Sequence, residues 1–181
     1  MIRLTLAATL GANYGIYGPA FELGENRAVR SGSEEYLDSE KYQVRNWDLD
    51  NPASLAELIA KINRIRRENP ALQADLNLNF HPVENEQIIA YSKMSDDLLN
   101  IIVAVVNLDP QRTQAGMIDL PLDLFYLDPR QPYQMHDLLT DAKYVWRGSR
   151  NYVELNPQRL PAHIFCIRRR VRTENGVDYF V

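Results

Sequence analysis

The residues best suited to chemistry lie together in one long polar loop. Residues 22–50 carry many charged side chains and few large aliphatic ones, and so long a structureless stretch is commonly either functional or disordered. Its densest part runs from Ser33 to Tyr42 and ends in Lys41 and Tyr42. An ammonium group beside a phenol can bind an anionic or polyhydroxylated ligand. Because such dipeptides are also common on protein surfaces, a solvated loop is the competing interpretation.

The other reactive side chains form no recognisable constellation. His81, His136 and His163 lack the spacing of metal ligands, so neither a metal nor another cofactor is expected. Carboxylates are numerous, but the sequence alone identifies no glycosidase-type pair. No nucleophile-elbow, phosphate-loop or dinucleotide motif is present. Cys166 lies in an alternating apolar run and is expected to be a buried structural thiol.

Composition narrows the class of protein. Hydrophobic residues make up 45% of the 181-residue chain and charged residues 24%, which is typical of a globular protein. The net charge of −4 makes nucleic acid an unsuitable partner. No apolar run reaches the length of a membrane span, and the first residues lack the layout of a signal peptide. A cytoplasmic protein is therefore expected.

The elements that must position the loop are two helices and a short strand. Residues 2–10 predict a helix that stops at Gly11, and residues 13–18 predict a short buried strand. Residues 52–68 predict a second helix with Asn51 as its N-cap and Asn69-Pro70 at its end. The arginines of its last turn suit the helix dipole and are interpreted as a solvated helix end rather than a phosphate site.

The rest of the chain predicts an antiparallel β-sandwich. Short apolar runs alternate with turn signals, as in sandwich domains. The expected strands are residues 87–91, 98–106, 113–120, 133–138, 144–146, 152–155 and 162–167. This half can bury its own core, whereas two helices and one strand cannot. The chain is therefore divided into residues 1–70, an incomplete domain, and residues 71–181, a sandwich whose last ten or so residues are a tail.

Four longer motifs resemble one family of enzymes. They are Leu6–Leu10, Asn13–Leu23, Gly32–Tyr42 and Trp47–Asp50. Together they resemble the alpha-1,4-glucan:maltose-1-phosphate maltosyltransferases of the alpha-amylase clan, and the resemblance continues through residues 137–141 and 152–157. It covers essentially the whole chain.

The resemblance implies a particular architecture. In that family a (β/α)8 barrel carries the active site and a β-sandwich C-terminal domain follows it. Residues 2–10, 13–18 and 52–68 would then be the seventh helix, eighth strand and eighth helix of the barrel. The chain is thus expected to be an α+β fragment, and Met1 to be either an internal methionine or the start of a shortened chain. The loop 19–50 would lie at the C-terminal face of the barrel, where such barrels keep their active sites.

The resemblance also implies an activity. The family transfers maltosyl from alpha-maltose 1-phosphate to the non-reducing end of an alpha-1,4-glucan with retention of configuration. Its catalytic carboxylates precede the seventh helix and have no counterpart here, so the fragment is expected to be inactive alone. The donor-site Lys-Tyr pair of the family matches Lys41 and Tyr42. Glu22 and Asn26 brace the rim of the site or have a structural role, and a homodimer is expected for the complete protein.

Two other functions remain open at this point. Trp146, Tyr144 and Tyr152 could present a sugar-stacking platform, which would make the sandwich a carbohydrate-binding module. The sandwich could instead be a purely structural domain that covers the barrel of an alpha-amylase-type enzyme and needs no ligand.

Overall fold

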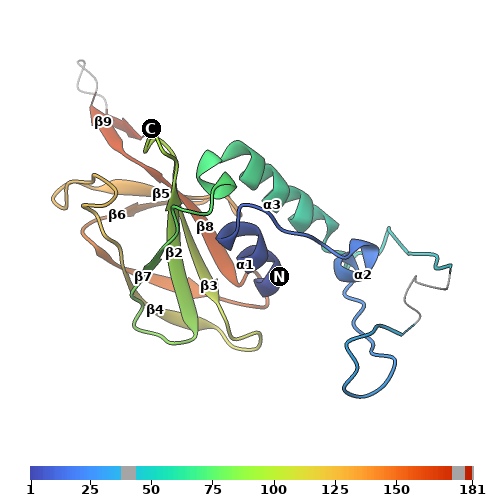
Figure 1. Cartoon of the computed structure of the whole chain (residues 1–181). Helices are drawn as coiled ribbons and strands as arrows, with labels where there is room; N and C mark the ends of the chain where they lie inside the picture. Colours follow the sequence, from blue (N-terminus) through green and yellow to red (C-terminus); the bar gives the residue numbers. More distant parts are fainter. Residues whose placement is uncertain (38–43, 173–177, 181) are drawn as a thin grey trace. The chain divides into compact units, whose positions relative to one another are not determined.

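The computed structural model describes residues 1–37, 44–172 and 178–180, without the side chains of residues 170–179 (Figure 1). The chain divides into two compact units. One comprises residues 1–13 and 62–181, and the other comprises residues 14–61. The predicted division between residues 1–70 and 71–181 stays a prediction.

The larger unit is an antiparallel β-sandwich. Its main sheet has six strands in the order β1-β2-β3-β8-β5-β6, and β4 pairs with β7 in a second, two-stranded sheet. Every strand pair is antiparallel. The bounds are β1 Asn79–His81, β2 Ile88–Met94, β3 Ile101–Asn107, β4 Gln114–Asp119, β5 Tyr133–Asp137, β6 Lys143–Trp146, β7 Arg150–Leu155 and β8 Ala162–Arg168.

The core of the sandwich lies between the two sheets. Alternate residues of each strand face inward, so Val103 of β3 lies opposite Phe165 of β8 on the same side of the main sheet. Ile118 and Val153 of the small sheet pack against this side, and all four are buried in one cluster. The predicted antiparallel C-terminal β domain is confirmed, and each of the seven predicted strands overlaps an observed strand.

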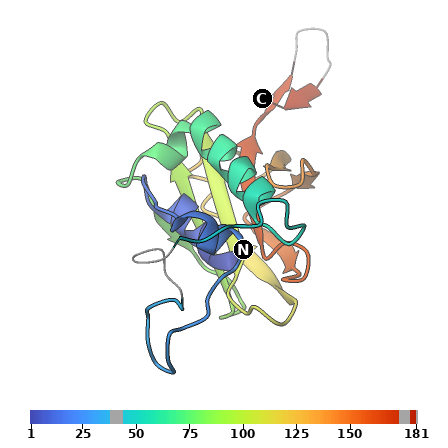
Figure 2. The ribbon, with the colours of Figure 1, turned by 90° about the vertical axis from the view of Figure 1, so that its right-hand side faces the viewer.

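Helices cover the outer face of the main sheet at its centre (Figure 2). Helix α1 (Ile2–Leu10) packs against β3 and buries Leu4 and Ala8. Helix α3 (Ala56–Glu68) buries Ile62 and Ile65, and the 3-10 helix η1 (Pro70–Gln73) packs against β2. Because this face is itself apolar, it needs such cover to exclude water.

The sequence did not predict three of the strands. β1 is only three residues long, too short for a periodic pattern. β9 (Arg170–Arg172) and β10 (Asp178–Phe180) pair with each other within the stretch that the sequence indicated as a tail.

Residues 13–18 form no strand, contrary to the prediction. Most of them are irregular, and Gly18 begins the short helix α2 (Gly18–Glu22). They are half-buried or exposed rather than buried. A strand needs a neighbour for its backbone hydrogen bonds, and the described part of the chain offers these residues none. Gly11 ends α1 as predicted but has an extended backbone rather than the left-handed conformation of a glycine cap.

Helix α3 ends at Glu68 as predicted but begins four residues later than predicted. Asn51 caps a tight turn instead, because its side-chain oxygen accepts a hydrogen bond from the Ala53 amide at 2.9 Å. Ser54 acts at the helix start, where its hydroxyl accepts a hydrogen bond from the Ala56 amide at 3.1 Å.

Candidate functional site

Lys41 and Tyr42, the predicted substrate-binding residues, lie outside the described residues, so their role stays a prediction. The structure does describe both flanks of this segment, up to Leu37 and from Val44 onward. These flanks show how the loop is attached within the unit of residues 14–61.

The preceding flank is a short antiparallel arm. The Val29 amide donates a hydrogen bond to the Glu35 carbonyl at 2.9 Å, and the Leu37 amide donates to the Arg27 carbonyl at 2.7 Å. Gly32, near the tip, has φ +77°, a conformation that favours glycine. At the base, the ring centroids of Tyr17 and Tyr36 lie 5.9 Å apart. The arm is therefore held by its backbone and by an aromatic contact.

The following flank is held by Arg45. Its guanidinium lies 3.2 Å from the Glu25 carboxylate and 4.3 Å from the centroid of the Trp47 ring. Glu25 and Arg27 are neighbours in the chain, so the same short segment ties both flanks of the loop. Tyr36 and Trp47 take part in these contacts, so aromatic side chains help to fix the two described flanks of the loop.

Glu22 joins this loop to the start of α3. Its carbonyl accepts a hydrogen bond from the Leu55 amide at 2.8 Å, and its carboxylate accepts one from the Ser54 hydroxyl at 3.0 Å. Both contacts of Glu22 are structural, which is the second of the two roles predicted for this residue. Asn26 is exposed, and its role stays a prediction.

Two cations hold the C-terminal end of α1. Arg66 was expected at a solvated helix end, but its guanidinium donates hydrogen bonds to the carbonyls of Ala8, Gly11 and Ala12. The ammonium of Lys93, a residue only 1% exposed, donates to the Leu10 carbonyl at 3.0 Å. Ala8, Leu10 and Gly11 carry carbonyls that a helix end leaves without internal partners, and Ala12 follows directly after them. We call this group, with Asp75, the α1 clamp.

Asp75 completes the α1 clamp with a negative charge. Its carboxylate accepts a hydrogen bond from the Ala12 amide at 2.5 Å. Burial lowers the pKa of Lys93, and the charge of Asp75 acts against that decrease. Lys93 lies on the same side of β2 as Tyr91, whose hydroxyl lies 2.6 Å from that of Thr9. No sequence signal indicated this site, because its residues come from distant parts of the chain.

The predicted motif of residues 137–141 has a structural role in the turn after β5. Asp137 is fully buried, and its carboxylate accepts hydrogen bonds from the Leu139 amide at 3.1 Å and the Thr140 hydroxyl at 2.5 Å. It also lies 3.0 Å from Nδ1 of His163. Burial alone raises the pKa of Asp137, but the hydrogen bonds from His163 and Thr140 outweigh it, so the net shift is downward.

The three aromatic residues considered for sugar stacking do not form one platform. Trp146 belongs to the core and packs edge-on against Phe165, with centroids 5.4 Å apart. Tyr152 is 58% exposed and lies on the outer side of the small sheet, opposite the buried Val153 side. Tyr144 lies on another sheet, beside the His163 ring. The stacking surface inferred from these residues is therefore absent.

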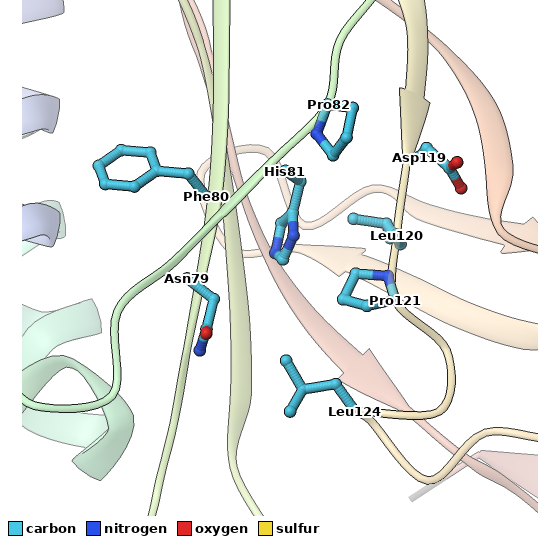
Figure 3. A pocket seen from close by; sticks show the side chains of 8 residues that line it. All are labelled: Asn79, Phe80, His81, Pro82, Asp119, Leu120, Pro121 and Leu124. Atoms are coloured by element: carbon cyan, nitrogen blue, oxygen red, sulfur yellow. The ribbon is translucent and has the colours of Figure 1, made fainter.

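A pocket of about 350 Å³ opens where β1 and the end of β4 diverge (Figure 3). Its lining residues are Asn79, Phe80, His81, Pro82, Asp119, Leu120, Pro121 and Leu124. The His81 ring points into the space between Asn79 and Pro121, whereas the Phe80 ring points away on the other side of the chain. No local sequence pattern links His81 to Asp119, Leu120 and Pro121, which follow almost forty positions later.

His81 is buried beside this pocket without a full set of partners. The residue is 8% exposed, and its ring meets that of Phe125 edge-on at 5.8 Å. Its Nε2 is buried and has no hydrogen-bond partner among the described residues. Burial lowers the pKa of His81 to about 4, so the ring is neutral at pH 7.

Three further observations concern a thiol, metal binding and membrane helices. Cys166 is buried, as predicted, and burial raises the pKa of its thiol. Across residues 1–37, 44–172 and 178–180, no group of three or more histidine, cysteine or acidic side chains could hold a metal ion. No helix in this described part of the chain is long and apolar enough to cross a membrane.

Comparison with known proteins shows which proteins this chain resembles. A family model described as "GLGE, C-terminal" matches residues 80–167. The alpha-1,4-glucan:maltose-1-phosphate maltosyltransferase of Chlorobaculum tepidum is 47% identical over 173 residues, which cover 92% of this chain and 26% of that protein. A maltosyltransferase of Streptomyces coelicolor with the same name, numbered 2, is 46% identical over 172 residues, 93% of this chain and 25% of that protein. The chain is homologous to the C-terminal part of these maltosyltransferases. It spans about a quarter of the length of the curated relatives it matches.

Solved structures resemble this chain in fold. The crystal structure of an AmyP variant with maltotriose superposes with a TM-score of 0.60 at 16% identity, over 90% of this chain and 33% of the other. The alpha-amylase of Geobacillus thermoleovorans, complexed with acarbose, superposes with a TM-score of 0.56 at 17% identity. This match covers 93% of this chain and 33% of the amylase chain. At these identities the likeness shows the fold alone, an amylase-type arrangement with an antiparallel β domain.

Proposed function

We propose that this chain forms the C-terminal part of a retaining maltosyltransferase that uses alpha-maltose 1-phosphate as donor and an alpha-1,4-glucan as acceptor. The supporting observation is the identity of about 45% to proteins of this name over about nine-tenths of the chain. A cytoplasmic location and a homodimer of the complete protein belong to the same proposal.

The proposed reaction takes place in two displacements. A carboxylate attacks the anomeric carbon of the donor, the bond to the phosphate oxygen breaks, and phosphate leaves. A second carboxyl group gives its proton to the departing phosphate in this first step. The 4-hydroxyl of the acceptor then attacks the anomeric carbon, the bond to the first carboxylate breaks, and the second carboxylate takes the hydroxyl proton as base. Both carboxylates belong to barrel strands that would precede α1, and this segment supplies Lys41 and Tyr42 to the donor site.

The helices and the loop are proposed to be the end of the (β/α)8 barrel. Helix α1 and helix α3 would be its last two helices, and residues 13–18 would become its eighth strand. Their irregular conformation is consistent with this role, because a barrel strand pairs with both neighbours and the described residues supply neither. The α1 clamp supports a fixed path for the chain as it enters residues 13–18.

The alternative is a carbohydrate-binding or purely structural β-sandwich module. Burial of Trp146 in the core weighs against a stacking platform built from the three aromatic residues. The dense packing of the sandwich on α1 suits a structural domain, and that role is compatible with the proposed enzyme.

Phosphate release tests the proposal. The isolated 181-residue chain is expected to release no phosphate from maltose 1-phosphate with glycogen present, because it contains no catalytic carboxylate of the family. The complete enzyme, with the barrel and the residues that precede this chain, is expected to release it. Turnover by a clean preparation of the isolated chain would overturn the assignment.

A substitution in the complete enzyme tests the donor site. Lys41→Ala is expected to lower kcat/KM for maltose 1-phosphate about ten-fold or more, because it removes a cation from the donor site. Lys61→Ala, on the exposed side of α3, is the matched control and should leave this value within about two-fold. Equal kinetics of the two variants would remove Lys41 from the site.

A further inference from the structure

The pocket beside β1 combines the features of a site for a neutral, hydroxyl-bearing ring. Two prolines and two leucines supply apolar surface, while the Asn79 amide, the Asp119 carboxylate and the His81 imidazole supply polar groups. Ligand pockets commonly combine a largely apolar lining with a few polar groups that fix orientation. A pyranose has a matching division between an apolar C–H face and a rim of hydroxyls.

The side chains that line the pocket disfavour anionic ligands and purely apolar ligands. Neither lysine nor arginine lines it, and Asp119 is its one acidic side chain, so phosphate esters and other anions are disfavoured. A purely apolar ligand would leave Nε2 of His81 without a hydrogen-bond partner, and such a buried group is costly. A neutral ligand with hydroxyl groups fits both restrictions.

We propose that this pocket binds a glucosyl unit of an alpha-1,4-glucan, with the His81 ring hydrogen-bonded to a sugar hydroxyl and Leu124 against its apolar face. The choice of glucan rests on the proposed function, whereas the pocket itself is independent of it. Nε2 is buried in this structure, so the proposed hydrogen bond requires the His81 ring to turn toward the pocket. Leu124 is 37% exposed and so is free to contact a ligand at the rim.

Titration of the 181-residue chain with maltotriose, followed by two-dimensional NMR, tests the site directly. We expect saturable shifts of the His81 ring nitrogens and of the Leu124 methyl groups, with a dissociation constant on the order of 1–10 mM. Inorganic phosphate and glycerol, at the same concentrations, should leave these signals in place. Equal shifts with phosphate would overturn the ligand class, and equal shifts with glycerol would overturn a sugar site.

Three variants separate the pocket from other surfaces. His81→Phe keeps a planar ring without nitrogen, and Leu124→Ser changes an exposed side chain that folding does not require. Each is expected to weaken maltotriose binding at least five-fold, whereas Tyr152→Ser, on the outer side of the small sheet, should leave it unchanged. Weakening by Tyr152→Ser alone would move the site to the small sheet and overturn the proposal.

The proposed sugar pocket and the proposed maltosyltransferase activity can each be overturned without the other. Phosphate release by the complete enzyme without maltotriose shifts at His81 would overturn the pocket and leave the maltosyltransferase assignment standing. Maltotriose binding at His81, with no phosphate release by the complete enzyme, would support the pocket as a glucan site and overturn the proposed activity.

Discussion

At the scale of single residues, two histidines of the β domain lie in contrasting environments. His163 has a carboxylate partner, because its Nδ1 lies 3.0 Å from Asp137. His81 has an aromatic neighbour in Phe125 and a buried nitrogen without a partner among the described residues. The two imidazoles belong to the same sandwich, so the difference between them lies in their neighbours.

The pKa of His81 predicts an acid-dependent loss of stability. Its folded-state pKa is about 4 and its unfolded value is 6.5, so between these values the unfolded chain binds more protons. The free energy of unfolding should therefore fall as pH decreases from about 6.5 to about 4. His81→Phe removes this contribution, and relative to it the native chain should lose about 1–3 kcal/mol over that range.

Urea unfolding of both proteins at several pH values from 7 to 4 measures the difference. The shared carboxylates titrate in both proteins, so their contribution cancels in the comparison. If the difference in free energy of unfolding between the two proteins stays constant from pH 7 to pH 4, His81 is solvated in solution.

Sequence patterns predicted the burial of some single residues but not the side-chain partners of others. Cys166 was predicted to be buried because its neighbours alternate along one strand, which is local information. The partners of the histidines could not be predicted, since Asp137 and His163 are 26 residues apart in the chain and meet only through strand pairing. For the same reason the pocket around His81 was missed.

At the scale of elements, the docking of α1 depends on cations from other elements. Helix α1 has no basic residue in its last turn, where a cation would stabilise the helix dipole. Arg66 of α3 and Lys93 of β2 supply this charge instead. One helix end thereby joins a helix and a strand that are distant in sequence.

The adjacent arginines of α3 allow a matched test of this contact. Arg66→Met should lower the free energy of unfolding by about 2–4 kcal/mol, because several charge-assisted hydrogen bonds to α1 carbonyls are lost. Arg67→Met, at an exposed position of the same turn, should change it by less than about 0.5 kcal/mol. Denaturant unfolding of the two variants checks the difference, and equal values would mean that the clamp contributes nothing.

Periodicity predicted most elements but not all of their ends. The bounds of α1 and the end of α3 follow from apolar spacing and from Asn69-Pro70. The start of α3 was wrong because Asn51 bonds within its own turn, and a side chain suited to capping suits a turn equally well. The predicted strand at residues 13–18 was wrong for this chain because pairing, not local pattern, determines whether a strand forms.

At the scale of the whole molecule, the compact unit that holds the sandwich also includes residues 1–13. Sequence patterns assigned these residues to the incomplete domain, because no local signal connects α1 with its partners Tyr91 and Lys93, more than eighty residues later. The apolar outer face of that sheet carries Ile102 and Ile164, both almost fully buried. The sandwich therefore cannot be separated from α1 without exposing apolar surface.

A chain without residues 1–13 should therefore be less stable and should associate. Removal of α1 uncovers the outer face of β2 and β3 and leaves the Tyr91 hydroxyl without its Thr9 partner. We expect a fall in Tm and a concentration-dependent increase in mass by light scattering after size exclusion. Point variants give the control at full length: Leu4→Asp, at a buried position, should reproduce both effects, whereas Arg3→Asp, at an exposed one, should not. If the shortened chain and Leu4→Asp both remain monomeric with the native Tm, α1 does not form part of this unit in solution.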